Sequence, residues 1–504
     1  SHVGNAAVLY TTDGNSEGYL KCGKIDSVYA TVDFGACEYS RKRTQTENVT
    51  ASFAAMRQYE PHGPLVNSEF YPGWLDHWGE PHNTVATARV VRTLKQMLAI
   101  NASVNIYMFI GGTNFGFTAG ANLALNPGFT PQPTSYDYDA PLSEAGDPTA
   151  KYFAIRDTVL QYMPTPPGDL PRPAPKGDYG TVIMRCLGSL FDFIPRQDPV
   201  KSRYPLTFEK LGQWSGFVMY QTRISKCFPD PALLSVPNVH DRAQVFVNKE
   251  LVGTLSRMQN IYKMPIQAVP GDEIILLVEN QGRVNYGSGL NDFKLSTLRI
   301  LLFTLVIVTF FLINIKISAL IHSTKIILII KQVFNYYVNL FLMMQGLLEN
   351  VTVDGVLLEY WSMYKIPLED HGAEIQKMIA QSKLESEIWK KSRAPAVYFE
   401  KFVLPSNITV FPPPDTFLDL AGWFKGFAII NGVNLGRYWS VAGPQRTLYL
   451  PGSLLKLAPA INQLAMVELE RAPEGCILAG EEEKCTVHMR VDPILDTRGC
   501  AIKP

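Results

Sequence analysis

The 504-residue chain has no surplus of charge of either sign and only seven cysteines. Lys and Arg together number 46, as do Asp and Glu, so the formal net charge is zero. A nucleic-acid-binding protein carries a basic face, and this balance argues against one. No two cysteines stand at C-x-x-C spacing, which argues against a zinc or thioredoxin-like site. Charged residues make up 18% of the chain and hydrophobic residues 46%, which excludes a disordered protein.

The sequence also begins on Ser1 rather than Met, and no charged and apolar leader opens it. We expect a processed N-terminus or a fragment that lacks its signal peptide. Cys476 and Cys485 are close enough to close a short loop, so a disulfide between them is plausible. Asn-x-Ser/Thr sequons, which agree with glycosylation in the secretory pathway, occur at Asn48, Asn101, Asn350 and Asn407.

Residues 295–345 differ from the rest of the chain, because they contain no Gly, Pro, Asp, Glu, Cys or Trp. Three interpretations stay open: a membrane-spanning helix, a hydrophobic β-rich core segment, or a translated intron. The apolar run 300–313 is short for the roughly 20 residues that a spanning helix needs. The segment is rich in residues with A/T-rich codons, which favours a retained intron.

The chain is long enough for two to four domains. Its first 160 residues alternate strand-like apolar runs with a helical pattern at 84–98, which predicts a parallel sheet or barrel. Four strands are expected, half of an eight-stranded barrel, at 8–11, 28–34, 65–70 and 104–111. Residues 161–180 are rich in Pro and predict a linker. The short alternating runs beyond it predict all-β sandwiches.

The stretch 67–79 carries the strongest chemical signal. It follows an apolar run, so Glu69 is predicted at the carboxyl end of a strand, where catalytic groups gather in parallel barrels. Tyr71, Trp74 and Trp78 follow closely and suit the apolar face of a sugar ring. A carboxylate among aromatics at a strand end is what a glycosidase nucleophile requires. The alternative is a solvated loop carboxylate.

Two further stretches, 105–116 and 134–144, combine polar and aromatic residues. Tyr107 and Asn114 could hydrogen-bond a sugar, or Tyr107 could pack in the barrel. Alternation places Tyr136 and Tyr138 on one face and the intervening acids on the other, so one pair could face a pocket. His77 and Asp76 are adjacent, a poor spacing for one metal ion, and loop or core roles are expected for both.

Together, these three stretches resemble the family-35 glycoside hydrolases, above all the lysosomal acid β-galactosidases of animals. The resemblance continues at 240–243, 278–287 and 422–439 and covers nearly the whole chain except 295–345. It implies a multidomain α/β plus all-β fold, in which the C-terminal half of a (β/α)8 TIM barrel precedes two β-sandwich domains of jelly-roll, galactose-binding-like type. The implied boundaries are 1–160 for the half barrel, 161–204 for the Pro-rich linker, 205–294 for the first sandwich, 295–345 for the insertion, 346–395 for the remainder of that sandwich with a linker, and 396–504 for the second sandwich.

The resemblance also implies a function. The parent protein is expected to be a lysosomal, retaining exo-β-galactosidase that removes terminal β-galactose from glycolipids, glycoproteins or oligosaccharides, without metal or organic cofactor. By resemblance, Glu69 matches the nucleophile and Tyr138 a galactose-binding tyrosine, and Tyr71, Trp74 and Tyr107 line the same pocket. Cys476 and Cys485 match a disulfide, and Asn48, Asn350 and Asn407 are taken as glycosylation sites. No nucleic-acid partner is implied, and a homo-oligomer is possible.

Two departures from the family pattern matter. The family's acid/base glutamate lies in an Asn-Glu motif, which does not occur here, so this chain alone is expected to be inactive. The segment 295–345 interrupts an otherwise continuous family pattern, which supports the retained-intron interpretation. Two alternatives stay open: a non-catalytic galactose-binding module, and a glycosidase tethered to the membrane through 295–345.

Overall fold

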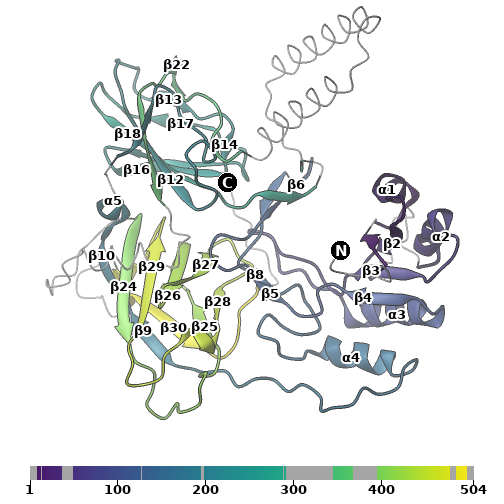
Figure 1. Cartoon of the computed structure of the whole chain (residues 1–504). Coiled ribbons are helices and arrows are strands. Elements are labelled where there is room, and N and C mark those ends of the chain that lie inside the picture. Colours follow the sequence, from purple (N-terminus) through teal and green to yellow (C-terminus); the bar gives the residue numbers. More distant parts are fainter. Residues whose placement is uncertain are drawn as a thin grey trace, which may run out of the picture. The chain divides into compact units, whose positions relative to one another are not determined.

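A computed structural model describes residues 8–12, 14–36, 49–126, 128–194, 198–287, 289–290, 344–366, 394–476 and 484–496 (Figure 1). The described residues fall into two compact units. Unit 1 draws on Ser1–Gly116, Gln132–Phe193 and Asp370–Pro504, and unit 2 on Phe117–Pro131 and Ile194–Glu369. Apart from Met344 and Gln345, the predicted insertion lies outside the described residues. Within the described ranges, no helix is long and apolar enough to cross a membrane.

Unit 1 begins with a sheet of four parallel strands in the order β1-β2-β3-β4. The strands are β1 (Tyr10–Thr12), β2 (Tyr29–Asp33), β3 (Val66–Phe70) and β4 (Ser103–Ile106). The helices are α1 (Glu17–Gly23), α2 (Val49–Tyr59), α3 (Thr87–Ala99) and α4 (Ala150–Val159) (Figure 1). The predicted alternation of strand and helix is confirmed, and the described residues form no closed barrel.

Helix α3 shows how sequence spacing builds this layer. Val90, Leu94 and Met97 recur at helical intervals, so they share one face. All three are buried in a core that includes Val32 and Phe70 from the sheet. The helix is thereby held against the strands that carry the candidate site.

The predicted strand 104–111 is too long, because β4 ends at Ile106. Tyr107 N–H still donates to the Phe70 carbonyl at 3.0 Å, but further along Gly111 N–H donates to the Leu142 carbonyl at 2.9 Å, and Leu142 N–H donates to the Phe109 carbonyl. An apolar run fits a loop held by other loops as well as a strand. The change of partner places the residues after Ile106 in a loop at the strand end.

Unit 1 also contains the second β-sandwich, formed by the sheets β10-β24-β29-β26-β27 and β28-β25-β30-β9. Its strands are β9 (Gly180–Ile183), β10 (Arg185–Ser189), β24 (Ala396–Phe402), β25 (Thr416–Asp419), β26 (Lys425–Ile430), β27 (Val433–Trp439), β28 (Thr447–Leu450), β29 (Asn462–Glu468) and β30 (Thr486–Arg490). Short elements of the same unit are β5 (Gly112–Thr113), β8 (Ser135–Tyr136), α5 (Leu190–Phe193), η1 (Gly452–Leu454) and η2 (Glu474–Cys476). Strands β9 and β10 lie inside the predicted linker 161–204, which is therefore partly sandwich.

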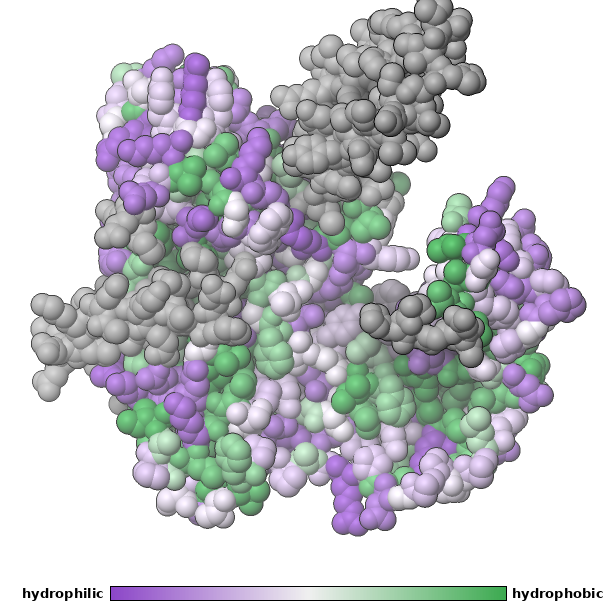
Figure 2. All heavy atoms as spheres, viewed as in Figure 1, coloured by the Kyte–Doolittle hydropathy of each residue, from purple (hydrophilic) through white to green (hydrophobic). Residues whose placement is uncertain are grey.

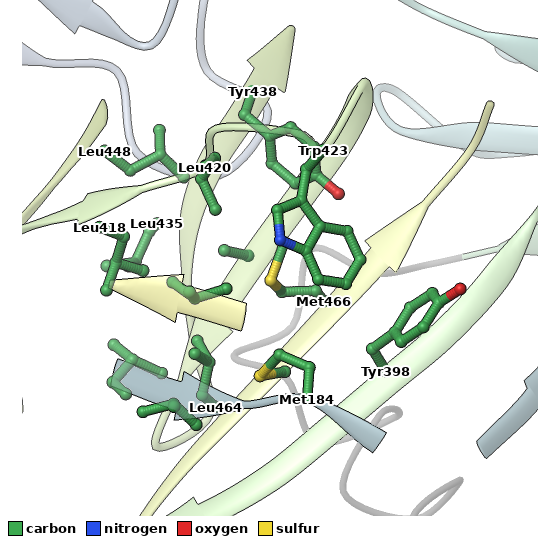
Figure 3. Close-up of a cluster of buried hydrophobic side chains, with 14 of the residues drawn as sticks. Met184, Tyr398, Leu418, Leu420, Trp423, Leu435, Tyr438, Leu448, Leu464 and Met466 are labelled. Carbon is green, nitrogen blue, oxygen red and sulfur yellow. The ribbon is translucent and has the colours of Figure 1, made fainter. Parts of the chain in front are cut away.

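Trp423 is fully buried in the core of this sandwich, with Met184, Leu418 and Met466 in the same cluster (Figure 3). Its ring meets that of Tyr398 edge-on at 4.8 Å, and its indole N–H donates to the Thr486 carbonyl at 2.8 Å. The large side chain is therefore packed and its polar atom is satisfied.

The predicted disulfide between Cys476 and Cys485 is present. Cys476 ends η2, and Cys485 directly precedes β30, so the bond joins these two elements. The sequons at Asn350 and Asn407 are exposed, as glycosylation requires, and Asn48 lies outside the described residues.

Unit 2 is the first sandwich, formed by the sheets β11-β23-β12-β18-β15-β16 and β17-β13-β21-β22. Its strands are β11 (Val200–Ser202), β12 (Phe217–Arg223), β13 (Ala232–Ser235), β14 (Val239–His240), β15 (Arg242–Val247), β16 (Glu250–Ser256), β17 (Lys263–Ile266), β18 (Glu273–Glu279), β20 (Gly346–Leu347), β21 (Thr352–Val353), β22 (Val356–Leu357) and β23 (Trp361–Ile366). Val218 and Tyr220 alternate along β12 and enter the core between the sheets. Figure 2 shows hydrophilic and hydrophobic side chains interspersed on the displayed face.

A segment of the predicted half barrel belongs to unit 2. Strand β6 (Ala121–Leu123) pairs in parallel with β19 (Val284–Tyr286) and antiparallel with β7 (Phe129–Pro131). The segment joins unit 2 because its pairing partner, β19, lies far along the chain.

Candidate active site

Glu69 lies at the carboxyl end of β3, as predicted from the sequence. Asp33 ends the neighbouring strand β2, and the parallel register pairs Asp33 with Glu69. Parallel strands bring their carboxyl ends to the same edge, so two acidic side chains meet there.

Tyr71 joins these two acids. Its hydroxyl oxygen lies 2.7 Å from Asp33 Oδ2 and 2.7 Å from Glu69 Oε2. Burial, together with the hydrogen bonds to both carboxylates, raises the pKa of the Tyr71 hydroxyl far above its ordinary value. The hydroxyl is therefore protonated at any physiological pH and can donate to one carboxylate at a time.

Aromatic rings surround this carboxylate pair. The Tyr71 ring lies 5.2 Å from Trp74 and 6.3 Å from Tyr107, and Tyr138 lies 6.0 Å from Trp74 and 5.9 Å from Tyr107. Tyr138 is buried, whereas Trp74 and Tyr107 are 38% and 37% exposed. The structure thus brings together four aromatic residues that the family resemblance assigns to one pocket.

Tyr136 extends the cluster, with its ring 5.3 Å from that of Tyr138. Burial raises the pKa of both hydroxyls, and the nearby charge of Glu69 raises them further. The two rings lie next to each other, although only Tyr136 lies in a strand, β8. Tyr138 has a φ of 65°, a left-handed conformation that is rare for a large side chain.

Lys151 on α4 holds the Tyr138 loop in place. Its buried Nζ donates to the Asp139 carbonyl at 2.6 Å, to Asp139 Oδ2 at 2.6 Å and to the Pro72 carbonyl at 2.8 Å. Burial lowers the pKa of this ammonium, and the Asp139 carboxylate opposes that shift. Lys151 therefore links the loop after β3 to the loop that carries Tyr138.

Gly73 allows the same two loops to approach each other. A Cβ atom at this position would lie 1.7 Å from the Tyr138 carbonyl oxygen. Only glycine fits so close an approach.

The remaining predicted residues have other neighbours. The amide of Asn114 donates to the Pro133 carbonyl at 3.1 Å. Asp76 accepts from His82 at 2.7 Å, while His77 pairs with Glu80 at 2.9 Å, so the adjacent Asp76 and His77 face different partners. Within the described ranges, no group of three or more His, Cys, Asp and Glu side chains is arranged to hold a metal ion.

Sequence reasoning missed Asp33 and Lys151. The signal for Asp33 was an acid closing the apolar strand run at 28–34, the same pattern that singled out Glu69. Lys151 gave no signal, because a lysine on a helix is ordinarily solvated.

Comparisons with known proteins agree with this arrangement. The family model described as "Glycosyl hydrolases family 35" matches residues 1–162. Models for the first all-beta domain and the galactose-binding domain of beta-galactosidase match 205–316 and 395–459.

Several curated animal proteins are similar over almost the whole chain. A bovine "Beta-galactosidase" is 40% identical over 98% of this chain and 67% of its own length. The human "Beta-galactosidase" is 39% identical over 98% of this chain and 64% of its own length. A mouse "Beta-galactosidase-1-like protein" is 37% identical over 94% and 62%.

The chain thus spans about two thirds of the length of these relatives. The matches extend through the strand-end acids, the aromatic loops and both sandwiches, and on that breadth the chain belongs to glycosyl hydrolases family 35.

Proposed function

We propose that this protein hydrolyses terminal, non-reducing β-D-galactose residues with retention, and that Glu69 is its nucleophile. The observation that carries the proposal is the Glu69 carboxylate at a strand end, bonded to Tyr71 and ringed by aromatic side chains. The names of the relatives support galactose as the sugar.

The geometry supports different roles for the two oxygens of the Glu69 carboxylate. Tyr71 donates to Oε2, which leaves Oε1 to attack the anomeric carbon. The new C–O bond forms as the aglycone oxygen leaves, through an oxocarbenium-like transition state. Rings of Trp74 and Tyr107 at the exposed rim supply apolar faces for the sugar.

A retaining glycosidase also needs a second carboxyl group about 5–5.5 Å away, across the glycosidic bond. Asp33 does not suit that role, because the Tyr71 hydroxyl lies between it and Glu69 at 2.7 Å from each. We therefore propose Asp33 as a positioning residue that acts through Tyr71, and we assign the proton donor to none of the described residues.

We extend the proposal to the type of each domain, the cellular compartment and the class of substrate. We propose that the four-stranded sheet is the C-terminal half of a TIM barrel and that the second sandwich is a jelly roll of galactose-binding type. We also propose that the protein acts in the lysosome on glycolipids, glycoproteins or oligosaccharides.

An activated substrate tests the nucleophile without requiring a proton donor. The full chain is incubated with 2,4-dinitrophenyl 2-deoxy-2-fluoro-β-galactoside, whose leaving group departs unprotonated. We expect a covalent fluorogalactosyl adduct, mapped to Glu69 by peptide mass spectrometry. An adduct on another residue contradicts the assignment, and saturable galactose binding without any adduct supports a non-catalytic galactose-binding module instead.

The shared hydroxyl gives a prediction for Tyr71. Tyr71→Phe should slow adduct formation by about 10- to 100-fold, the effect of removing one hydrogen bond to a charged group. Asp33→Asn should slow it less, because Tyr71 can still donate to Glu69. Tyr29→Phe is the matched control. Tyr29 lies in β2 of the same sheet, and its hydroxyl donates to the Pro64 carbonyl rather than to Glu69. Equal rates for Tyr71→Phe and the control would contradict the role.

Lys151 gives a prediction that separates binding from chemistry. Lys151→Met should loosen the Tyr138 loop and raise the reagent concentration needed for half-maximal labelling by about tenfold, with a smaller effect on the saturated rate. Lys24→Met, which removes a more exposed ion pair with Glu60, is the control. A fall in the saturated rate alone would show that Lys151 does not act through the loop.

A further inference from the structure

Unit 2 contains an open groove of about 770 Å³ that the proposed hydrolysis does not use. It lies where β12 ends and β23 begins, strands whose register pairs Gln221 with Ser362. The tip of the β21–β22 hairpin at Gly355 completes the lining. The volume falls within the range of about 300–1,000 Å³ typical of small-ligand sites.

The lining of the groove is rich in hydrogen-bonding groups. The residues that line it include Gln221, Thr222, Ser225 and Ser362. Thr222 is buried, and its hydroxyl donates to the Glu359 carbonyl at 2.7 Å. This bond links β12 to the segment that precedes β23. Hydroxyl and amide groups at this density match the many hydroxyls of a sugar.

Tyr360 stands at the rim as an exposed aromatic platform. Its side chain is 76% exposed, and its backbone has a φ of 61°, a left-handed conformation that costs free energy for a bulky residue. The Tyr360 N–H donates to the Arg203 carbonyl at 2.9 Å, which holds this conformation. A large ring kept outside the core at such a cost is a feature of ligand-binding loops.

The charge of the groove is positive. Its lining carboxylate, Glu359, is bound by Arg203 at 2.9 Å. Arg223 donates to the Gly271 carbonyl at 3.0 Å and lies 3.5 Å from Glu273, a loose pair. Lys226 is exposed and forms no ion pair within the described part of the chain. An anionic ligand would therefore meet Lys226, while the Glu359 and Glu273 carboxylates are each paired with an arginine.

We propose that this groove binds an acidic sugar of a glycan, with its carboxylate against Lys226 and its ring against Tyr360. The proposal is independent of the hydrolytic function, because all the lining residues belong to unit 2. The groove would give the protein a second contact with acidic glycans, separate from the terminal galactose.

The test uses the methyl glycoside of N-acetylneuraminic acid, which contains no galactose and so does not report on the Glu69 pocket. Saturation-transfer NMR with the full chain measures its binding, and methyl β-glucoside serves as the neutral probe. We expect binding of the acidic probe, weakened about three- to fivefold by Lys226→Gln. Tyr360→Asn, which removes the ring but tolerates the left-handed backbone, should weaken binding at least about fivefold.

Lys263→Gln is the matched control, since Lys263 is exposed in the same unit but does not line the groove. It should leave binding unchanged, and all three variants should keep the thermal unfolding midpoint of the parent chain. Absence of binding, equal binding of the neutral probe, or equal binding by Lys226→Gln and the parent chain would each overturn the proposal.

Discussion

Replacing Glu69 with alanine is expected to lower the rate of 2,4-dinitrophenyl β-galactoside cleavage by about 10⁴-fold or more, as removal of a catalytic nucleophile does in other enzymes. The leaving group needs no proton, so the assay isolates bond formation at the anomeric carbon. Glu69→Gln should be equally inactive, because an amide keeps the shape and the contact with Tyr71 but lacks the negative charge. Release of dinitrophenolate is the measurement.

Added azide provides the stereochemical control. In Glu69→Ala the small anion can attack the anomeric carbon directly from the vacated face, expelling dinitrophenolate and giving α-galactosyl azide. In the parent chain azide instead attacks the α-linked galactosyl-Glu69 ester and gives β-galactosyl azide with release of the carboxylate. The β product from Glu69→Ala would show that another carboxylate is the nucleophile.

The sequence predicts the position of Glu69 because its signal is local: an apolar run of strand length ends at an acid, and aromatic residues follow. The contact with Asp33 has no such signal. It depends on the parallel register of β2 and β3, which pairs residues far apart in the chain. The Tyr71 hydroxyl therefore contacts both acids because the sheet aligns β2 with β3, and no local sequence motif predicts this contact.

Two elements of the fold show the same limit. Strands β9 and β10 lie next to a Pro-rich stretch, and they are strands because β30 and β24, far along the chain, pair with them. The segment that contains β6 joins unit 2 because β19 is its neighbour. In both cases, pairing at long range overrides what local composition predicts.

Arg257→Met is expected to destabilise unit 2 by about 3–5 kcal/mol, the cost of breaking a buried ion pair by removing one partner. Arg257 Nη1 lies 2.9 Å from Asp241 Oδ1, and the two side chains are 5% and 0% exposed. The guanidinium also lies 4.3 Å from the centre of the Phe129 ring, so its loss weakens the attachment of β7. Chemical denaturation monitored by tryptophan fluorescence measures the change.

Arg223→Met is the control, because Arg223 is 68% exposed and its pair with Glu273 is loose at 3.5 Å. We expect a change of less than about 1 kcal/mol for this variant. If the two variants lost similar amounts of unfolding free energy, burial of the Arg257–Asp241 pair would not be the reason for its contribution. The double variant Arg257→Met with Asp241→Leu should recover part of the stability, since it leaves no buried charge unpaired.

The cost of Arg257→Met should also depend on pH. Burial raises the pKa of the Asp241 carboxyl to about 6 from an ordinary value of 3.8, Arg257 and the Gln281 N–H lower it, and nearby Glu279 raises it. A folded-state pKa above the unfolded value means that the contribution of Asp241 to stability is present below about pH 4 and is lost as pH rises through about 6. Removing Arg257 raises that pKa further, so the variant should lose more stability at about pH 7.5 than at about pH 5. His240 is a second ionisable side chain at this site, with its Nδ1 3.3 Å from Arg257 Nη1, so the comparison is repeated in His240→Asn. Suppose that Arg257→Met lowers the unfolding free energy equally at both pH values, with His240 and with His240→Asn. That result would show that Arg257 does not stabilise unit 2 by compensating the charge of Asp241.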